Sequence, residues 1–457
     1  LALFRGQFAV AGMLGGSLLF YGWWDYRFLA LIIAVGIITY TGGIVLEKKR
    51  SAFILWLFIL LVLSFLLYFK YFVFVASSVN DIAKLVGSES FLPITEILLP
   101  VGISFFTFQS IGYLVDVYRR DIDAERSPIF MLLFLAYFPQ LVAGPIERAA
   151  HLIPQLKALK SGFIERADLV GGLFMIVQGT FLKFVIADNL GVYVDDVYRN
   201  VERFQDWDAL IASYFFSIQI YGDFYGYTLI ALGSSRLFGI DIVNNFNHPY
   251  FAPNIQEFWR RWHISLSNWF RDYVYIPLGG GRASRSRSMF NLIFTMALVG
   301  LWHGASYTFM LWGAIHGLLL VAHRIFRFLF PVADALGEKG FSSLVWRGIG
   351  IFVTFNLVSL AWIPFRAPDY ETAKAMFVAI FTALTSLEPF ATAHYFQQFY
   401  FMIAGIFLIF ALLDRFVPLR SMFVRMPIVV QAASIVALFI IAYLGPENDV
   451  QFIYFQF

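Results

Sequence analysis

Long runs of apolar residues, separated by short polar connections, dominate this chain. The runs predict helices at roughly 8–24, 28–46, 52–76, 92–116, 169–187, 209–233, 288–302, 305–330, 345–365, 371–386, 398–413 and 428–445. A helix needs about 20 apolar residues to cross the hydrocarbon core of a bilayer, and most runs approach that length. We therefore expect an all-α fold, a polytopic transmembrane helix bundle of about eleven spans, with residues 1–457 forming one membrane domain.

One apolar stretch, at 128–147, is interrupted. Pro139 and the pair Gly144-Pro145 break it, and basic residues flank both of its ends. Because cytoplasmic loops carry an excess of Lys and Arg, a full crossing would leave one basic flank outside. We expect a re-entrant segment entered from the cytoplasm, which is tolerated only inside protein or beside a water-filled cavity. An ordinary Pro-kinked span is the alternative.

Composition supports the membrane assignment and excludes several classes of function. Hydrophobic residues make up 60% of the chain and charged residues 14%, with a mean hydropathy of +0.73. A soluble domain is about 25% charged, so a soluble enzyme is excluded. The absence of cysteine excludes disulfides, thiol nucleophiles and Cys-based metal sites. The net charge of +3 is too small to indicate nucleic acid as a partner. Because the chain begins at Leu1, we expect an upstream span to be missing.

The least membrane-like part of the chain is 241–287, and it contains a predicted helix at 254–272. Asn254 can cap this helix, with Glu257 in capping-box spacing. Helical periodicity gathers one apolar row and two neighbouring polar rows. The apolar row is Trp259, Trp262, Leu266 and Trp269, and the polar rows are Arg260, His263, Ser267 and Arg271, then Arg261, Ser265, Asn268 and Asp272. Two interpretations remain open, a helix lying in the headgroup layer and a helix lining a polar cavity.

His303 lies between two long apolar stretches, where an ionisable side chain is costly and usually faces the bundle interior. Histidine titrates near neutrality, so it can take a proton from a hydroxyl group. His316 lies about 220° further round a continuous helix and does not share a face with His303. No acidic ligand cluster or HExxH motif accompanies them, so we expect no metal site. We expect His316 to be a structural residue bonded to a neighbouring helix.

Other polar residues suggest weaker candidates. Asp223 lies in an apolar segment and is expected to be paired or to face a cavity. A structural hydrogen bond to a Tyr or Arg and a role in substrate binding are the two interpretations. We expect His151, His248 and His394 to lie in loops.

Several of these residues belong to stretches that resemble the membrane-bound O-acyltransferase family, most closely its bacterial branch of the alginate O-acetyltransferase type. The matching stretches are 99–106, 138–145, 223–227, 258–272, 300–304 and 452–457. The blocks at 258–272 and 300–317 are long and specific. Relatives more often have serine at Tyr225 and Thr228, a departure that bears on the acceptor and not on the class.

The resemblance implies a bundle around a central tunnel, with an acyl donor entering from the cytoplasm and a hydroxyl acceptor from the far side. It implies that His303 and His263 are catalytic residues, and we assign His303 as the general base. We expect substrate to be bound by Trp302, Arg260, Ser267, Asn268 and Asp223. The oxyanion of the acyl group would be held by His263, Asn268 or a tunnel arginine.

We therefore expect a multi-pass O-acyltransferase of the bacterial inner membrane. It would move an acetyl group from a cytoplasmic thioester, acetyl-CoA, to a hydroxyl of an extracellular or periplasmic polysaccharide or to a partner protein. No tightly bound cofactor is expected, but a separate periplasmic or membrane partner protein is. The alternatives are a D-alanyl transferase fed by a carrier protein, a peptidoglycan acyltransferase, and a glycan or lipid transporter. A transporter predicts matching broken helices in two halves, and only 139–145 is broken.

Overall fold

A computed structural model describes residues 7–87, 97–142, 144–159, 166–204, 206–330, 341–386 and 397–443, together with 92 and 94. The described residues form helices and their connections, and none of them lies in a strand. They group into two compact units. The N-terminal unit comprises Leu1–Gly172 and Ala231–Val243, and the C-terminal unit comprises Leu173–Ile230 and Asn244–Phe457. That the whole chain is one membrane domain stays a prediction.

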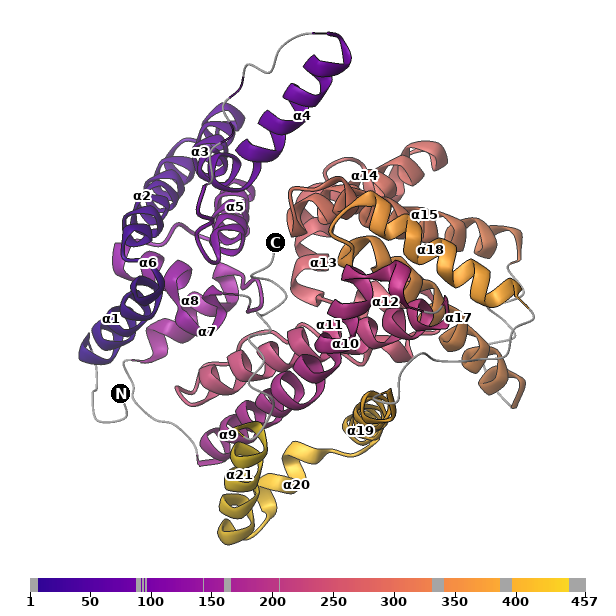
Figure 1. Cartoon of the computed structure of the whole chain (residues 1–457). Helices are drawn as coiled ribbons and strands as arrows, with labels where there is room; N and C mark the ends of the chain where they lie inside the picture. The colour runs from indigo at the N-terminus through magenta and orange to yellow at the C-terminus, as the bar shows by residue number, and fades with distance from the viewer. Residues whose placement is uncertain are drawn as a thin grey trace. The chain divides into compact units, whose positions relative to one another are not determined.

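The N-terminal unit contains the first helices of the chain (Figure 1). They are α1 (Gln7–Trp24), α2 (Arg27–Lys48), α3 (Ala52–Leu66), the π-helical turn η1 (Leu67–Tyr71), α4 (Phe72–Leu85), α5 (Ile103–Arg119), α6 (Pro128–Ala136), α7 (Phe138–Leu141) and α8 (Ala149–Ala158), followed by the start of α9 (Arg166–Phe181). Helix α2 buries residues at helical spacing, including Leu31, Val35 and Leu46, and packs against α5 and α6. The helix predicted at 92–116 begins only at Ile103, because Pro100 and the left-handed Gly102 precede it.

The interrupted stretch forms two short helices, α6 and α7, which meet at the non-helical residue Tyr137. Gly102 approaches α7 so closely that a Cβ atom there would lie 2.1 Å from the carbonyl oxygen of Leu141, and its φ of +73° also favours glycine. At 9 and 4 residues, neither helix is long enough to cross a bilayer. The predicted break is confirmed, and entry from the cytoplasm stays a prediction.

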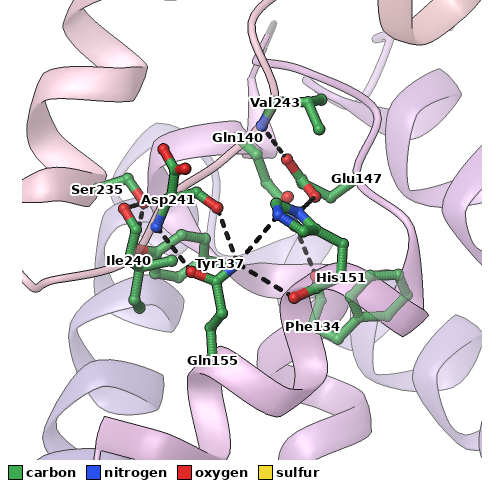
Figure 2. Close-up of polar contacts among 10 residues, drawn as sticks. All are labelled: Phe134, Tyr137, Gln140, Glu147, His151, Gln155, Ser235, Ile240, Asp241 and Val243. Atoms are coloured by element: carbon green, nitrogen blue, oxygen red, sulfur yellow. Dashed lines mark hydrogen bonds and ion pairs between the residues drawn. The ribbon is translucent and has the colours of Figure 1, made fainter.

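Hydrogen bonds of Glu147 link the segment before α8 to the 237–243 connection of the same unit (Figure 2). Its buried carboxylate accepts hydrogen bonds from the Val243 backbone N–H at 2.5 Å and from Nδ1 of His151 at 2.7 Å. The hydrogen bond to Glu147 raises the pKa of His151 above its ordinary value. The prediction that His151 lies in a loop is wrong, because residues 149–158 form helix α8.

Further bonds hold the same connection (Figure 2). The Gln155 side chain donates to the Asp241 carbonyl at 2.8 Å and accepts from the Asp241 backbone N–H at 2.8 Å. The Tyr137 hydroxyl lies 2.9 Å from Oγ of Ser235, which in turn donates to the carbonyl of Ile240 at 3.0 Å. Side chains from α6–α8 therefore satisfy backbone groups that a connection without regular structure leaves open.

We expect Glu147→Ala to destabilise the protein by about 1–3 kcal/mol, because the Val243 N–H loses its acceptor. The His151 part of this loss depends on pH. Since the pKa of His151 is raised in the folded protein, its contribution is complete below the unfolded pKa of about 6.5 and disappears as pH rises through the raised value. The His151 side chain is 43% exposed, so solvent screening keeps this part small.

Thermal unfolding of wild type, Glu147→Ala and His151→Ala in detergent at pH 5.5 and 8.5 checks this expectation. The gap between wild type and Glu147→Ala should be wider at pH 5.5, and His151→Ala should lose mainly the pH-dependent part. A gap that widens toward pH 8.5 would contradict the assigned ion pair.

The C-terminal unit contains the remaining elements (Figure 1). They are η3 (Leu182–Ala187), α10 (Asp188–Arg199), η4 (Val201–Arg203), most of α11 (Asp206–Arg236), η5 (Pro249–Phe251), α12 (Ile255–Arg261), α13 (Ile264–Phe270), η6 (Arg271–Tyr275), η7 (Gly280–Arg282), α14 (Arg285–His303), α15 (Tyr307–Leu329), α17 (Phe341–Arg366), α18 (Tyr370–Thr385), α19 (Gln397–Phe416), α20 (Leu419–Arg425) and α21 (Ile428–Tyr443).

Helices α14 and α15 form a tight antiparallel pair in this unit (Figure 1). A Cβ atom on Gly300 would lie 2.1 Å from the Phe309 carbonyl oxygen, and one on Gly313 would lie 2.2 Å from that of Met296. Small residues let transmembrane helices approach closely, and here glycine on both helices does so. The pair therefore holds His303, at the end of α14, in a fixed position.

Six helices among the described residues are long and apolar enough to cross a membrane. They cover Arg27–Lys48, Ala52–Leu85, Asp168–Arg199, Tyr307–Leu329, Ser342–Arg366 and Gln398–Phe416. Many large apolar side chains on these helices are exposed, among them Trp56, Phe352 and Leu408. Lipid is the solvent that such surfaces require, so the chain is an all-helical, multi-pass membrane protein.

Candidate active site

The predicted helix at 254–272 is interrupted. Helix α12 ends at Arg261, α13 begins at Ile264, and His263 between them has a left-handed backbone with φ of 43°. The prediction of one continuous helix is therefore wrong. The predicted start is confirmed, because Oδ1 of Asn254 accepts a hydrogen bond from the Glu257 backbone N–H at 2.9 Å.

Asn245 explains the interruption. Its backbone carbonyl accepts from the Ile264 N–H at 3.0 Å, and its side-chain oxygen accepts from the Ser265 hydroxyl at 2.7 Å. These bonds replace intrahelical ones at the point where the chain turns. A left-handed backbone is uncommon outside glycine and persists where surrounding contacts over-determine it. His263 consequently leaves the polar row in which helical periodicity had placed it.

His263 is completely buried. Its Nδ1 lies 3.3 Å from Oδ1 of Asn245, and because an amide oxygen only accepts, Nδ1 carries the proton and Nε2 keeps the lone pair. Burial lowers the pKa of His263 to about 3, so the imidazole is neutral at physiological pH. The ring packs edge-on against Phe224 at 4.7 Å.

His303 is the last residue of α14 and is 5% exposed. Its ring lies 6.4 Å from that of His263 between centroids, so the structure brings together the two histidines predicted to be catalytic. Trp302, at 4.8 Å from His303 and 5.8 Å from His263, contacts both rings. The negative end of the α14 dipole would stabilise the imidazolium that forms when His303 takes a proton.

A cavity of about 310 Å³ lies beside these helices in the C-terminal unit. Four polar residues of the predicted rows line it, namely Arg260, Ser267, Asn268 and Arg271. The four members of the apolar row are buried, namely Trp259, Trp262, Leu266 and Trp269. The surface of this cavity is mainly apolar, and neither His263 nor His303 is among the residues that line it, so both interpretations of the segment stay open. Arg260 also pairs with Glu257 at 2.7 Å, and Arg271 with Asp272 at 2.7 Å.

Asp223 is placed elsewhere. It is 2% exposed, and Oδ1 lies 2.9 Å from Nζ of Lys183, which also pairs with Asp188 at 2.7 Å. Asp223 is not among the residues that line the cavity. Of the two interpretations, a structural role is favoured, with a lysine in place of the expected Tyr or Arg.

Sequence reasoning assigned His316 a bond to a neighbouring helix. His316 is fully buried, but neither of its ring nitrogens has a hydrogen-bond partner within the described part of the chain. Its ring instead packs against Trp312 at 5.0 Å and Trp259 at 5.1 Å. Trp312 also contacts His303 at 5.1 Å, so His316 adjoins the site through one tryptophan.

Two residues that position others in this unit were not predicted from the sequence. Asn245, which holds His263, lies in an unremarked polar connection, and Lys183 lies inside an apolar run where it resembles an isolated charge. Only Lys183 gave a usable signal, because a lysine within a membrane span requires a partner. Among the described residues, no group of three His, Asp or Glu side chains is arranged to hold a metal ion.

The arrangement suits proton transfer from a hydroxyl group. A buried histidine at a helix end lies next to a second neutral histidine, and a cavity whose mainly apolar wall also carries amide, hydroxyl and guanidinium groups adjoins the same helices. A base beside donors that can stabilise an oxyanion is the constellation required for acyl transfer.

Comparisons with known proteins agree with this chemistry. A family model described as MBOAT, membrane-bound O-acyltransferase family, matches residues 44–363. A probable alginate O-acetylase, AlgI, of Pseudomonas aeruginosa is 38% identical over 394 residues, covering 84% of this chain and 73% of that protein. A peptidoglycan O-acetyltransferase of Helicobacter pylori is 35% identical over 385 residues, covering 78% and 71%. A teichoic acid D-alanyltransferase of Bacillus subtilis is 30% identical over 283 residues, covering 59% and 69%.

The chain belongs to the membrane-bound O-acyltransferase family. It is therefore a multi-pass membrane O-acyltransferase, as the resemblance in the sequence implied.

Proposed function

We propose that this O-acyltransferase moves an acetyl group from cytoplasmic acetyl-CoA to a hydroxyl group of an extracellular or periplasmic polysaccharide. The observation that carries the proposal is the buried pair of His303 and His263, 6.4 Å apart between ring centroids, on helices that also line a cavity with Arg260, Ser267 and Asn268 in its wall. Relatives named as alginate and peptidoglycan O-acetylating enzymes support acetyl as the group and a cell-envelope glycan as the acceptor.

His303 acts as the general base in this proposal. As the acceptor oxygen bonds to the thioester carbonyl carbon, His303 takes the hydroxyl proton, which makes a poor nucleophile competent. Collapse of the tetrahedral intermediate breaks the carbon–sulfur bond, and the imidazolium returns the proton to the leaving thiolate. The products are an O-acetyl ester and free CoA, and His303 ends in its starting state.

The tautomer of His263 narrows its role. Because its Nδ1–H points to Asn245, a neutral His263 offers a lone pair at Nε2 and cannot donate a proton to an oxyanion there. We therefore assign His263 to accepting a hydrogen bond from a substrate hydroxyl or water. The oxyanion role passes to the Asn268 amide or the Arg260 guanidinium, which line the cavity.

The surroundings of the reaction follow from the same proposal. The enzyme works in the bacterial inner membrane, with the donor reaching the site from the cytoplasm and the acceptor from the far side. A periplasmic or membrane partner protein receives the acetyl group or presents the polysaccharide. Arg260, Ser267, Asn268 and Trp302 contact the substrates.

Membranes containing the chain, supplied with acetyl-CoA labelled in the acetyl group, test the proposal. We expect label in an extracellular glycan or a partner protein, and ester linkages that mild alkali releases. A parallel reaction supplies a carrier protein loaded with labelled D-alanine. Transfer of label from that carrier, with none from acetyl-CoA, would show that the enzyme is a D-alanyl transferase. Acetyl label in peptidoglycan would show that peptidoglycan is the acceptor. Membranes from cells lacking the chain are the control.

A further inference from the structure

The α14–α15 pair carries a second cavity at the end away from His303. It has a volume of about 490 Å³ and shares four lining residues with the 310 Å³ cavity, so the two cavities adjoin each other. The shared residues are Gln256, Tyr275, Leu292 and Leu320. We call the two cavities together the long groove.

The outer end of the long groove is basic. His323, Arg324 and Arg327 line it, and no Asp or Glu is among the described residues lining either cavity. The sequence from 273 to 329 contains five arginines and no acidic residue. The arginines are Arg282, Arg285, Arg287, Arg324 and Arg327. Basic residues cluster on the cytoplasmic side of membrane proteins, so this end of the groove faces the cytoplasm.

The arginines at this end are held by the protein. Nη1 of Arg324 donates to Oγ of Ser288 at 2.6 Å, and Ser288 is completely buried. The Arg285 guanidinium lies 3.7 Å from the ring centroid of Phe328, a residue that lines the groove. Arginines that only anchor a helix end would extend along the helix surface to lipid headgroups. Here two of them are oriented by side chains of the facing helix.

The long groove leads toward His303. On α14 it is lined by residues at helical spacing, Leu292, Thr295, Met296 and Val299. His303 follows Val299 by four positions and therefore continues the same face. Ser288 and His303 lie 15 positions apart on this helix, which corresponds to about 22 Å. His303 itself lines neither cavity, but the inner end of the groove stops one helical turn from it, at Val299. These dimensions would suit a ligand with an anionic head at the basic end and an extended arm directed toward His303.

We propose that Arg324 and Arg327, with His323, bind the phosphate groups of the acyl donor and thereby select a donor that carries several phosphates on its own head group. This inference rests on the proposed acetyl transfer and deepens it. Arginine binds phosphate oxygens through paired, charge-assisted hydrogen bonds. A nucleotide thioester presents several phosphate charges to this end, whereas an arm on a carrier protein presents one phosphodiester.

The test compares wild type with Arg324→Gln/Arg327→Gln, each purified and reconstituted in nanodiscs. We expect the KM for acetyl-CoA to rise about tenfold or more in the variant, with kcat within about twofold. Acetyl-pantetheine, a thioester without the phosphates, should be used equally well by both proteins. Arg347→Gln on α17 is the matched control. Arg347 is exposed and is not among the residues that line either cavity, so its replacement removes one arginine charge without touching the groove.

Two outcomes would overturn the inference. An equal loss with acetyl-CoA and acetyl-pantetheine would mean that the arginines support the fold and not the donor head. The second outcome is a double variant whose KM for acetyl-CoA is unchanged and whose activity falls in phosphatidylglycerol nanodiscs but not in phosphatidylcholine nanodiscs. That result would mean that the two arginines bind lipid phosphate and not the acyl donor.

Direct binding of CoA, measured by calorimetry, separates this inference from the proposed function. We expect wild type to bind CoA about tenfold or more tightly than the double variant, and high salt to weaken the binding. If CoA binding depends on the arginines but no acetyl group reaches a glycan or a partner protein, phosphate binding in the groove is supported and the proposed acetyl transfer is contradicted. Equal CoA binding by wild type and the double variant would contradict phosphate binding by Arg324 and Arg327, whatever the transfer activity.

Discussion

Replacing His303 with alanine is expected to lower acyl transfer by about 10²–10⁴-fold while the protein remains in the membrane, because a positioned general base contributes that factor. His303 lies at the end of α14 with its ring against Trp302 and Trp312. The His303 ring also lies 6.4 Å from that of His263 between centroids. The measurement is the initial rate of label transfer from acetyl-CoA in membranes with matched expression.

The variant His303→Asn provides the control for packing. Asparagine keeps a polar side chain at the helix end but has no basic nitrogen to accept the proton. We expect it to be as inactive as the alanine variant, with thermal unfolding closer to wild type. Retention of more than about a tenth of the activity by His303→Asn would exclude general-base catalysis by this residue.

Lys183→Met is expected to destabilise the protein by about 3–5 kcal/mol, because it leaves two buried carboxylates without their cation. The Lys183 side chain is 15% exposed, and those of Asp188 and Asp223 are 6% and 2% exposed. All three charges lie within helices of the C-terminal unit, two of them in the membrane-crossing stretch Asp168–Arg199. Charges at such positions persist only when they are paired.

The expected order of stability among three variants of this ion cluster gives a stricter test. Asp223→Asn leaves one acid and one base, and should cost less than Lys183→Met. The triple variant Lys183→Met/Asp188→Asn/Asp223→Asn removes every charge and should recover part of the loss. Unfolding in a detergent series measures all four proteins. If Asp223→Asn were less stable than Lys183→Met, the charge balance inferred for this cluster would be incorrect.

The two sets of variants also separate chemistry from architecture. Asp223 belongs to the family-like stretch 223–227, and the structure places it in an ion cluster and not in the cavity lining. Loss of activity in Asp223→Asn should therefore track loss of folded protein. In His303 variants, activity should fall while folded protein persists.

The fold was largely predictable because a helix that crosses lipid requires a continuous apolar run, which is visible in the local sequence. Helices α1, α2, α11, α15 and α17 lie within a few residues of the predicted ranges, since each is marked by an apolar run between polar ends. Boundaries failed where backbone geometry intervened. Helix α5 starts at Ile103 and not at 92, because Gly102 adopts a positive φ and Pro100 precedes it.

The site was predictable in its residue types but not in its geometry. The polar rows containing Arg260, Ser267 and Asn268 were visible from helical spacing, and the structure places these residues around one cavity. His263 was assigned to the same rows, yet it lies at a helix break and is completely buried. The acyl donor, the partner protein and the catalytic roles of these residues rest on the proposals above.

By itself, the sequence determined that this chain is an all-helical membrane protein, and it predicted His303 as a costly side chain with a functional role. Both conclusions depend on local properties, namely the length of apolar runs and the free-energy cost of an ionisable group in lipid. Only the tertiary structure decided that His263 meets His303, because that meeting depends on a left-handed residue fixed by Asn245, 18 positions away. The pairing of Asp223 with Lys183 is decided in the same way. Contacts between distant segments leave no periodic trace in the sequence, so no local pattern could have revealed them.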